Sequence, residues 1–580
     1  MSSILFRRVR VRHIGVGLFG LVLLSTFYHL YPHRIDPILS QPESVTLALD
    51  EPDRPPNWPQ RADEVKQAFL HAYHAYEKYA LPKDHLLPVS SLGVNDFNGW
   101  GVTMYDSLST MLLMDLKDEF ARALPLIAQQ NFTMPPAVVN KNKHTAPVVA
   151  PFFETVIRYL GGLLSAYALS KEPILLDRAD NLGTKLWGAF DTPSGLPAYG
   201  VNTENGKNLI KSIAVLAEVA SCQLEYVYLA KLTGKKEHYD RSARIMQILN
   251  EADRSALGMF PSRWDVLSGL PIGHQLSVGG AADSAHEYLL KLYLLTGKSD
   301  QASLDLYIQT ANTVLSTLLY VSPLRGLLYV TDLSPSPMPS HKFEHLSCFL
   351  PGLLALGVHS LPDTAFATQG PTPTSSKTAD ELRHWDWKEL HMLAAQGLAE
   401  SCYQMYEDQP TGLGPDEVKF IDGGELWVNK LEKWRMTGKQ GNIPGIGAKK
   451  QQEMRGGPTE YSTRSGRYLL RPETVESIYL MWRVTGDDVW RERGYAIFRA
   501  LEREAKMPVG YASLRSVSVA NAHHNDDMPS YFLAETLKYL FLLFHDEDLV
   551  PLDRWVFNTE AHPLPIFEWT SVERTKFGIQ

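Results

Sequence analysis

Apolar and polar positions follow one pattern in four segments of the chain: an amphipathic helix ends, a tight polar turn follows, and a second amphipathic helix begins. The turns start at Ser170, Thr233, Thr296 and Thr485. The first three lie 63 residues apart, and the last interval, 189 residues, is three times as long. A fixed period of helix pairs predicts a helical array that either stays open or closes on itself.

The expected helices are strongly apolar on one face, as in EYLLKLYLLTG and AETLKYLFLLF, whereas the alternation that is typical of strands is sparse. These features predict an all-α fold with two layers of helices. We expect the array to close into an α/α toroid, in which the inner helices end around a central cavity.

The N-terminal part of the chain does not follow this pattern. Residues 1–13 carry four arginines, and residues 14–31 are an apolar run at the short end of what spans a bilayer. No clear small-x-small cleavage site follows, so we expect an uncleaved signal anchor with a cytoplasmic tail, and a cleaved signal peptide is the alternative. The proline-rich residues 32–58 predict an extended stem, and residues 59–580 would form one lumenal domain.

Charge and cysteine content limit the kinds of ligand that the chain can bind and the cellular compartment in which it can fold. The formal net charge is −9 and no long basic run occurs beyond the N-terminus, which argues against nucleic acid and favours a neutral or weakly polar ligand. Three cysteines in an oxidising lumen are most simply one disulfide and one buried thiol. Because Cys222 lies inside a helical pattern, we expect Cys348 to pair with Cys402. A sequon at Asn131 agrees with a secretory route.

Acidic residues occur at the ends of the expected helices, in aromatic and aliphatic surroundings. In YLLRPETVESIYLMW, Pro472 suits the first turn of a helix, and Glu473 and Glu476 then lie on one face. The helix dipole should keep both carboxyls ionised, although acids are simply common in first turns. Four more junctions show the same pattern and carry Glu154 with Arg158, Asp283 with Glu287, Glu535, and Thr559 with Glu560.

Carboxylates at the rim of a cavity, with aromatic neighbours, are what glycoside hydrolysis requires. One acid protonates the leaving oxygen, one base activates water, and rings bind a face of the sugar. Two alternatives stay open: a carbohydrate-binding module without turnover, and a helical scaffold with no small ligand. The spacing of these residues alone does not distinguish a glycoside hydrolase from a carbohydrate-binding module.

Several longer motifs resemble a known family. They are FNGWGVTMYDSLSTMLLMDLKDEF, FFETVIRYLGGLLSAY, LLDRADNLGTKLWGAFDTPSGLP, HLSCFLPGLLALG, CYQMYEDQPTGLGPD, YLLRPETVESIYLMWRVTGD and VFNTEAHPL. From about Ala62 to Pro565 the chain resembles the class I α-1,2-mannosidases, glycoside hydrolase family 47. The resemblance implies an (α/α)7 barrel that binds one Ca²⁺ and removes terminal α-1,2-linked mannose from high-mannose N-glycans on glycoproteins, with inversion.

The resemblance also implies roles for individual residues. Glu154 and Asp283 match the two candidates for the general acid, and Glu473 matches the general base. Thr559 matches the calcium ligand, through its hydroxyl and its carbonyl. Positions around the mannose and its water network are matched by Arg158, Glu218, Glu287, Arg471, Glu476, Glu535 and Glu560. Tyr531 matches a ring against the sugar, His345 matches a position lining the site, and Cys348 and Cys402 match the family disulfide.

Some positions leave alternatives open. Ala281 stands where the endoplasmic-reticulum enzymes that stop after one mannose have arginine, so the chain resembles the Golgi-type and fungal enzymes more closely. Glu287, Glu476 and Glu560 could serve only as salt-bridge partners. A lectin-like or weakly trimming relative in glycoprotein degradation is the alternative function. We expect a monomeric type II membrane protein of the Golgi or endoplasmic reticulum.

Overall fold

The computed structural model describes residues 56–134, 149–254, 258–334, 338–367, 385–451 and 459–579. Contacts separate Met1–Pro56 from a unit that spans Asn57–Gln580. The expected cytoplasmic tail and signal anchor, and the stem up to residue 55, lie outside the described residues. Trp58, expected as the last residue of the stem, is the first residue of a helix. Within the described ranges, no helix is long and apolar enough to cross a membrane.

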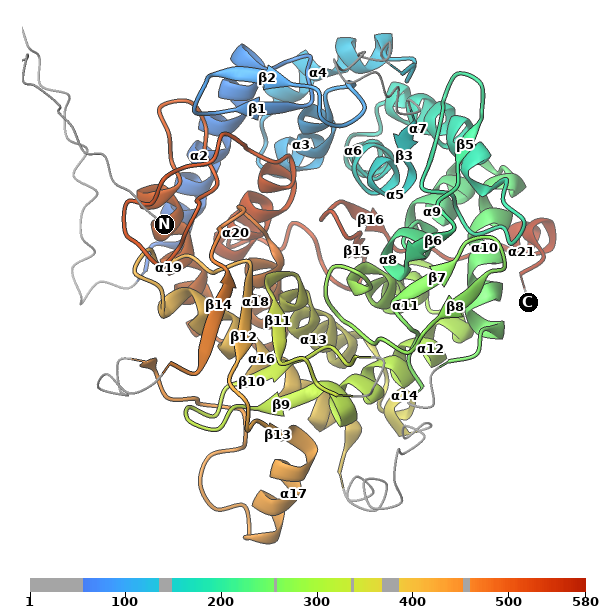
Figure 1. Cartoon of the computed structure of the whole chain (residues 1–580). Coiled ribbons are helices and arrows are strands. Elements are labelled where there is room, and N and C mark those ends of the chain that lie inside the picture. Colours follow the sequence, from blue (N-terminus) through green and yellow to red (C-terminus); the bar gives the residue numbers. More distant parts are fainter. Residues whose placement is uncertain are drawn as a thin grey trace, which may run out of the picture. The chain divides into compact units, whose positions relative to one another are not determined.

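Seven helices with largely buried surfaces form an inner ring in the described part of the unit (Figure 1). Each contacts the next, and the ring closes because the π-helical turn that precedes the last helix, η6 (Phe532–Thr536), contacts the first. The inner helices are α3 (Val102–Leu113), α6 (Gly161–Ser170), α9 (Gln223–Thr233), α11 (Asp283–Leu295), α13 (Leu350–Ser360), α18 (Glu473–Thr485) and α20 (Leu537–Phe544).

Seven amphipathic helices form the outer layer, and each precedes an inner helix along the chain (Figure 1). In the first of them, Val65, Phe69, Ala72 and Tyr76 are buried at helical spacing. The outer helices are α2 (Trp58–Tyr79), α4 (Lys117–Gln129), α7 (Pro173–Lys185), α10 (Lys236–Glu251), α12 (Gln301–Thr313), α16 (Trp387–Glu407) and α19 (Val489–Glu504). The two layers make the (α/α)7 barrel, and the fold class expected from the sequence is confirmed.

The four repeated turns all lie at the C-terminal ends of inner helices. In each, a hydroxyl donates to the carbonyl four residues earlier, at 2.7 Å for Ser170, 2.8 Å for Thr233, 2.9 Å for Thr296 and 2.7 Å for Thr485. In three of the turns the same hydroxyl also accepts the backbone N–H two residues later, at Glu172, Lys235 and Asp487, and so links the end of the helix to the turn. The chain then turns outward into the next outer helix, which explains the period in the sequence.

In the ranges that the structure describes, short strands join the helices in six small sheets. They are β1 (His85–Leu87), β2 (Leu92–Val94), β3 (Ala150–Pro151), β4 (Gly200–Val201), β5 (Asn208–Leu209), β6 (Ile213–Val215), β7 (Arg263–Asp265), β8 (Leu270–Ile272), β9 (Leu319–Val321), β10 (Leu328–Val330), β11 (Lys342–Glu344), β12 (Glu417–Phe420), β13 (Glu425–Leu426), β14 (Tyr461–Ser465), β15 (Trp555–Phe557) and β16 (Pro563–Pro565). The pairs within these sheets are antiparallel.

Shorter helical segments complete the described unit. They are α5 (Phe152–Glu154), η1 (Thr155–Leu160), η2 (Leu186–Phe190), α8 (Leu216–Val219), η3 (Val314–Leu318), η4 (His345–Phe349), α14 (Asp363–Ala367), α17 (Trp427–Met436) and α21 (Ser571–Phe577). Of these, η4 is joined to the outer helix α16 by a disulfide between Cys348 and Cys402, the pair expected from the sequence. Cys222 is a buried free thiol.

The β15–β16 hairpin lies in the middle of the ring (Figure 1), and its turn is fixed by buried side chains. The amide oxygen of Asn558 accepts the backbone N–H groups of Glu560 (3.0 Å) and His562 (2.8 Å). The amide nitrogen of Asn558 donates to Glu225 of α9 (2.7 Å) and to the carbonyl of Ile157 in η1 (3.0 Å). Asn558 therefore holds the turn together and ties it to two segments of the barrel.

Candidate active site

A cavity of about 240 Å³ lies between the inner helices and the hairpin turn. Seven carboxylates and two guanidinium groups line it, and they are Glu154, Asp283, Glu287, Glu473, Glu476, Glu535 and Glu560 with Arg158 and Arg471. Tyr531 and Thr559 also line the cavity. The structure therefore brings together the residues that the sequence suggested, except that Glu218 lines a neighbouring pocket and His345 lies behind Glu473.

Glu473, the first residue of α18, is held by groups that come from distant parts of the chain. The Nδ1 atom of His345 lies 2.7 Å from Glu473 Oε2. Arg471 is oriented by Asp416, whose Oδ1 accepts from Arg471 Nε at 3.1 Å. Burial opposes ionisation of Glu473, but the hydrogen bond from His345 and the charge of Arg471 outweigh it and lower the pKa of Glu473. Glu473 can therefore accept a proton at neutral pH.

The two candidates for the general acid have different surroundings. Asp283 begins α11, and the N–H of Ser284 donates to its Oδ1 at 2.7 Å. Burial raises the pKa of Asp283 to about 7, and the charges of Glu287 and Glu473 act in the same direction. Glu154 is in an ion pair instead, with its Oε2 atom 2.9 Å from Arg158 Nε. Asp283 thus keeps a proton near neutral pH, beside an ionised Glu473.

Glu476 lies one turn after Glu473 on the same helix but in a different environment. Lys291 of α11 forms an ion pair with Glu287 and lies 3.9 Å from Glu476, and the hydroxyl of Tyr539 lies 3.4 Å from Glu476 Oε1. Burial raises the pKa of Glu476 to about 8, although Lys291 opposes the shift. The expectation that the helix dipole keeps both acids ionised is wrong for Glu476, because desolvation outweighs the dipole.

Arg158 connects the acids on one side of the cavity. Besides Glu154, it forms an ion pair with Glu560 of the hairpin turn, and its Nη1 atom lies 3.5 Å from Asp106 of α3. Glu535 forms no ion pair within the described part of the chain, and burial together with repulsion from Glu560, Glu473 and Glu476 raises its pKa well above the ordinary value, although Arg158 opposes the shift. This wall of the cavity therefore holds more carboxylates than the neighbouring cations can balance.

The excess of carboxylates over cations in this wall bears on whether the cavity can bind a metal ion. Thr559 offers a hydroxyl and a carbonyl oxygen, and the groups around it in the lining are carboxylates, which are the hard donors that Ca²⁺ prefers. In the described residues, no group of three or more His, Cys, Asp or Glu side chains is arranged to hold a metal directly. The donor set therefore fits a cation that takes oxygens from Thr559 and from water, with the carboxylates balancing its charge.

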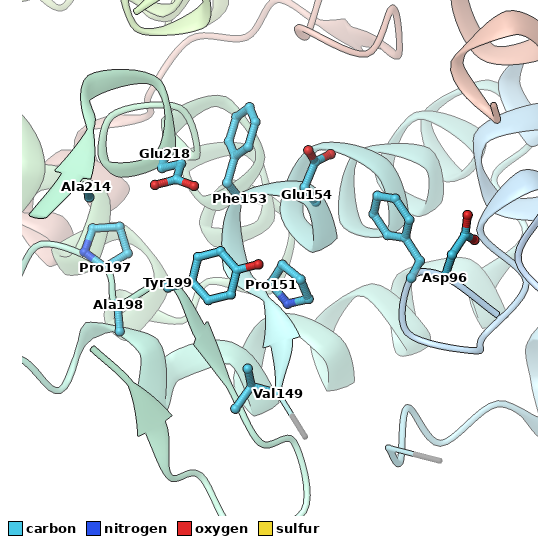
Figure 2. A pocket seen from close by; sticks show the side chains of 11 residues that line it. Asp96, Val149, Pro151, Phe153, Glu154, Pro197, Ala198, Tyr199, Ala214 and Glu218 are labelled. Atoms are coloured by element: carbon cyan, nitrogen blue, oxygen red, sulfur yellow. The ribbon is translucent and has the colours of Figure 1, made fainter. Parts of the chain in front are cut away.

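A second pocket, of about 320 Å³, adjoins the cavity and shares Phe153 and Glu154 with it. Glu218 of α8 and Asp96 line this pocket, together with the ring of Tyr199. Figure 2 shows Glu154 between Glu218 and Asp96 in this view, with the Tyr199 ring across from them. Carboxylates and rings in one pocket can accept hydrogen bonds from hydroxyl groups and pack against sugar faces.

The helical barrel and the acidic cavity together define a class of protein, the (α/α)-barrel glycoside hydrolases. Comparison with known families specifies it further, because the model of Glycosyl hydrolase family 47 matches residues 68–566. The chain belongs to this family. The resemblance to class I α-1,2-mannosidases, expected from about Ala62 to Pro565, is confirmed.

Individual relatives agree with this assignment. The chain is 33% identical to human mannosyl-oligosaccharide 1,2-alpha-mannosidase IC, over 87% of this chain and 70% of the human protein. It is 35% identical to the human endoplasmic reticulum mannosyl-oligosaccharide 1,2-alpha-mannosidase, over 88% of this chain and 64% of that protein. The solved alpha-1,2-mannosidase from Trichoderma reesei matches with a TM-score of 0.74 and 29% identity, over 89% of this chain and all of that one. These identities do not separate the branches of the family.

Four side chains near the site were not predicted from the sequence. Lys291 and Lys538 are buried in inner helices, where Lys538 donates to the carbonyl of Ala561 in the hairpin turn. Asp106 is buried beside Arg158, and the hydroxyl of Tyr406 lies 2.6 Å from His345 Nε2. The signal for the two lysines is a single charge inside an apolar run, as in EYLLKLYLL and ETLKYLFLL. The sequence around Asp106 and Tyr406 has no comparable feature.

Proposed function

We propose that the chain is an inverting α-1,2-mannosidase that trims terminal α-1,2-linked mannose from high-mannose N-glycans. Its relatives are named as mannosidases of this specificity. The observation that carries the proposal is the opposite protonation of two carboxyls in one cavity, an ionised Glu473 and an Asp283 with a pKa of about 7. Such a pair supplies a base and an acid at the same pH.

In the proposed reaction, Glu473 accepts a proton from water while the water oxygen forms a bond to the anomeric carbon. Asp283 donates its proton to the glycosidic oxygen as the bond from that oxygen to the anomeric carbon breaks. Water attacks from the face opposite the leaving group, so the released mannose has the inverted configuration. Glu154, in its ion pair with Arg158, then orients the sugar rather than delivering the proton.

The proposed function includes the binding of one Ca²⁺ ion in the cavity. Thr559 would hold a Ca²⁺ ion through its hydroxyl and carbonyl oxygens, and Glu287, Glu476, Glu535 and Glu560 would surround it through water. When bound, the ion supplies a positive charge that binds the hydroxyl groups of the sugar. The surplus of buried carboxylates in this wall supports the assignment.

The second pocket would take the sugars next to the terminal mannose, because it adjoins the cavity at Glu154. Ala281 lies in the turn before α11, where its small side chain offers no hydrogen bond to a branch of the glycan. We therefore expect progressive trimming toward five mannoses. A digest in which a single eight-mannose product accumulates and goes no further would contradict this expectation.

The membrane assignment is proposed on the sequence of residues 1–58. A type II membrane protein would expose residues 59–580 to the lumen of the Golgi or endoplasmic reticulum, where high-mannose glycans are processed. The full chain should then resist extraction by alkaline carbonate, and its barrel should be protected from protease in intact vesicles. Recovery of the full-length chain in the soluble fraction would contradict the anchor.

The test of the proposed activity compares the full chain with its Glu473→Gln variant on a high-mannose glycan. Glutamine keeps the shape of the side chain but cannot take up the proton, so kcat should fall by several orders of magnitude while glycan binding persists. Binding without release by the unmutated chain would instead favour the lectin-like alternative. Equal turnover by both proteins would remove Glu473 from the role of base.

A further inference from the structure

His345 has a hydrogen-bond partner at each ring nitrogen. Its Nδ1 atom lies 2.7 Å from Oε2 of Glu473, and its Nε2 atom lies 2.6 Å from the hydroxyl of Tyr406. The hydroxyl of Thr474 is a more distant neighbour of Nε2, at 3.3 Å. The imidazole and the Tyr406 hydroxyl are buried, so water does not compete for these bonds.

The chemistry of the partners determines which nitrogen carries the proton. An ionised carboxylate only accepts hydrogen bonds, so the bond to Glu473 requires a hydrogen on Nδ1. In a neutral imidazole, Nε2 then has a lone pair and needs a donor. Tyr406 supplies it, because burial raises the pKa of its phenol well above the ordinary value and the hydroxyl keeps its hydrogen.

We propose that Tyr406 is a positioning residue: its hydroxyl donates to Nε2 of His345 and so fixes the tautomer in which Nδ1–H donates to Glu473. The chain of donors runs in one direction, from Tyr406 through His345 to the group assigned as the base. This inference rests on the proposed function, since it concerns how Glu473 is kept ready to accept a proton.

A covalent link keeps the two donors in place. Tyr406 lies on α16, one turn after Cys402, and His345 lies on η4, three residues before Cys348. The disulfide therefore joins the same two elements that the Tyr406–His345 hydrogen bond joins. Because this link is independent of the hydroxyl, Tyr406→Phe should remove one hydrogen bond without moving either element.

Other groups also act on Glu473 and would be unchanged in that variant. Arg471 favours its ionised form, and five further titratable side chains of the surrounding elements interact with it. These are Asp283 of α11, Glu476 of α18, Glu535 of η6, Tyr468, and Tyr531, which precedes η6. Loss of the His345 bond would leave Arg471 alone against burial, so Glu473 would hold its proton more tightly.

The test is the pH dependence of mannose release by the full chain and its Tyr406→Phe variant. We expect kcat to fall about tenfold with little change in KM, and the acidic limb of kcat/KM to move to higher pH. Adding Thr474→Val, which removes the second donor, should deepen the loss. Tyr403→Phe removes a hydroxyl from the same helix and is the matched control, expected to leave kcat and the pH profile unchanged.

A second pair of variants separates positioning from packing. His345→Asn keeps an amide donor near the place of Nδ1 but has no atom equivalent to Nε2, so Tyr406→Phe should cause no further loss in that background. An equal loss in both backgrounds, or an unshifted acidic limb in Tyr406→Phe, would overturn the inference. Absence of mannose release by the unmutated chain would instead refute the proposed function, so the two failures are distinguishable.

Discussion

At the scale of single residues, the site depends on two carboxyl groups that hold their protons with different strength. Glu473 must be ionised to accept a proton, and it loses this capacity only as the pH falls through a pKa that lies below the ordinary 4.5. Asp283 must be protonated to donate, and it loses its proton as the pH rises through about 7. The active form is the one that exists between these two values.

We therefore predict a bell-shaped dependence of kcat/KM on pH, with an alkaline limb near pH 7 and an acidic limb below pH 4.5. Initial rates on a glycan substrate across the pH range would measure it. Asp283→Asn should reduce kcat by about 10²-fold or more, since an amide cannot deliver the proton. Asp553→Asn, at an exposed position, is the control. Constant activity from pH 5 to pH 9 would contradict the assignment of Asp283, and an acidic limb above pH 4.5 would contradict that of Glu473.

The identity of the acids could be predicted from sequence, but their protonation could not. Glu473 and Glu476 lie three residues apart and share one helix dipole, yet the pKa of the first is lowered and that of the second is raised. The difference comes from His345, 128 residues away, and from Glu287 of α11, whose charge raises the pKa of Glu476. Neither can be deduced from local sequence, because each depends on which distant segments pack against the helix.

At the scale of elements, the long helices were predictable and the connections were not. The turns at Thr233 and Thr485 could be recognised because each ends an apolar helix and carries a hydroxyl that bonds back to it. The strands are two to five residues long, which is too short for a period of two to stand out. The hairpin turn was recognised only through VFNTEAHPL, and its role as the centre of the barrel depends on contacts with several helices.

The turn of the β15–β16 hairpin gives a prediction for a single element. Asn558→Ala removes four hydrogen bonds and leaves buried partners unsatisfied, so it should lower the free energy of unfolding by about 3 kcal/mol. It should also lower activity, because Thr559 and Glu560 follow in the same turn. Thermal unfolding measures the first effect, and Asn205→Ala in an exposed turn is the control. A melting temperature equal to that of the control would show that the turn is held by other contacts.

At the scale of the whole molecule, a metal ion in the centre of the barrel would stabilise every element that meets there. Removal of Ca²⁺ should therefore abolish activity and lower the melting temperature, because the ion binds only the folded cavity. Readdition of Ca²⁺ should restore both better than Mg²⁺, which demands tight octahedral geometry. Calorimetry and turnover on the same samples would measure this. Full activity in excess chelator, after verified removal of the metal, would refute the proposal.

The most direct test of the proposed mechanism is the configuration of the first mannose that the enzyme releases. The base and acid assigned to Glu473 and Asp283 act with a water between base and sugar, so the product must leave with its anomeric centre inverted. Proton NMR of a high-mannose glycan digest in its first minutes distinguishes the two anomers before they equilibrate. We predict that β-mannose appears first. Initial release of α-mannose would contradict it.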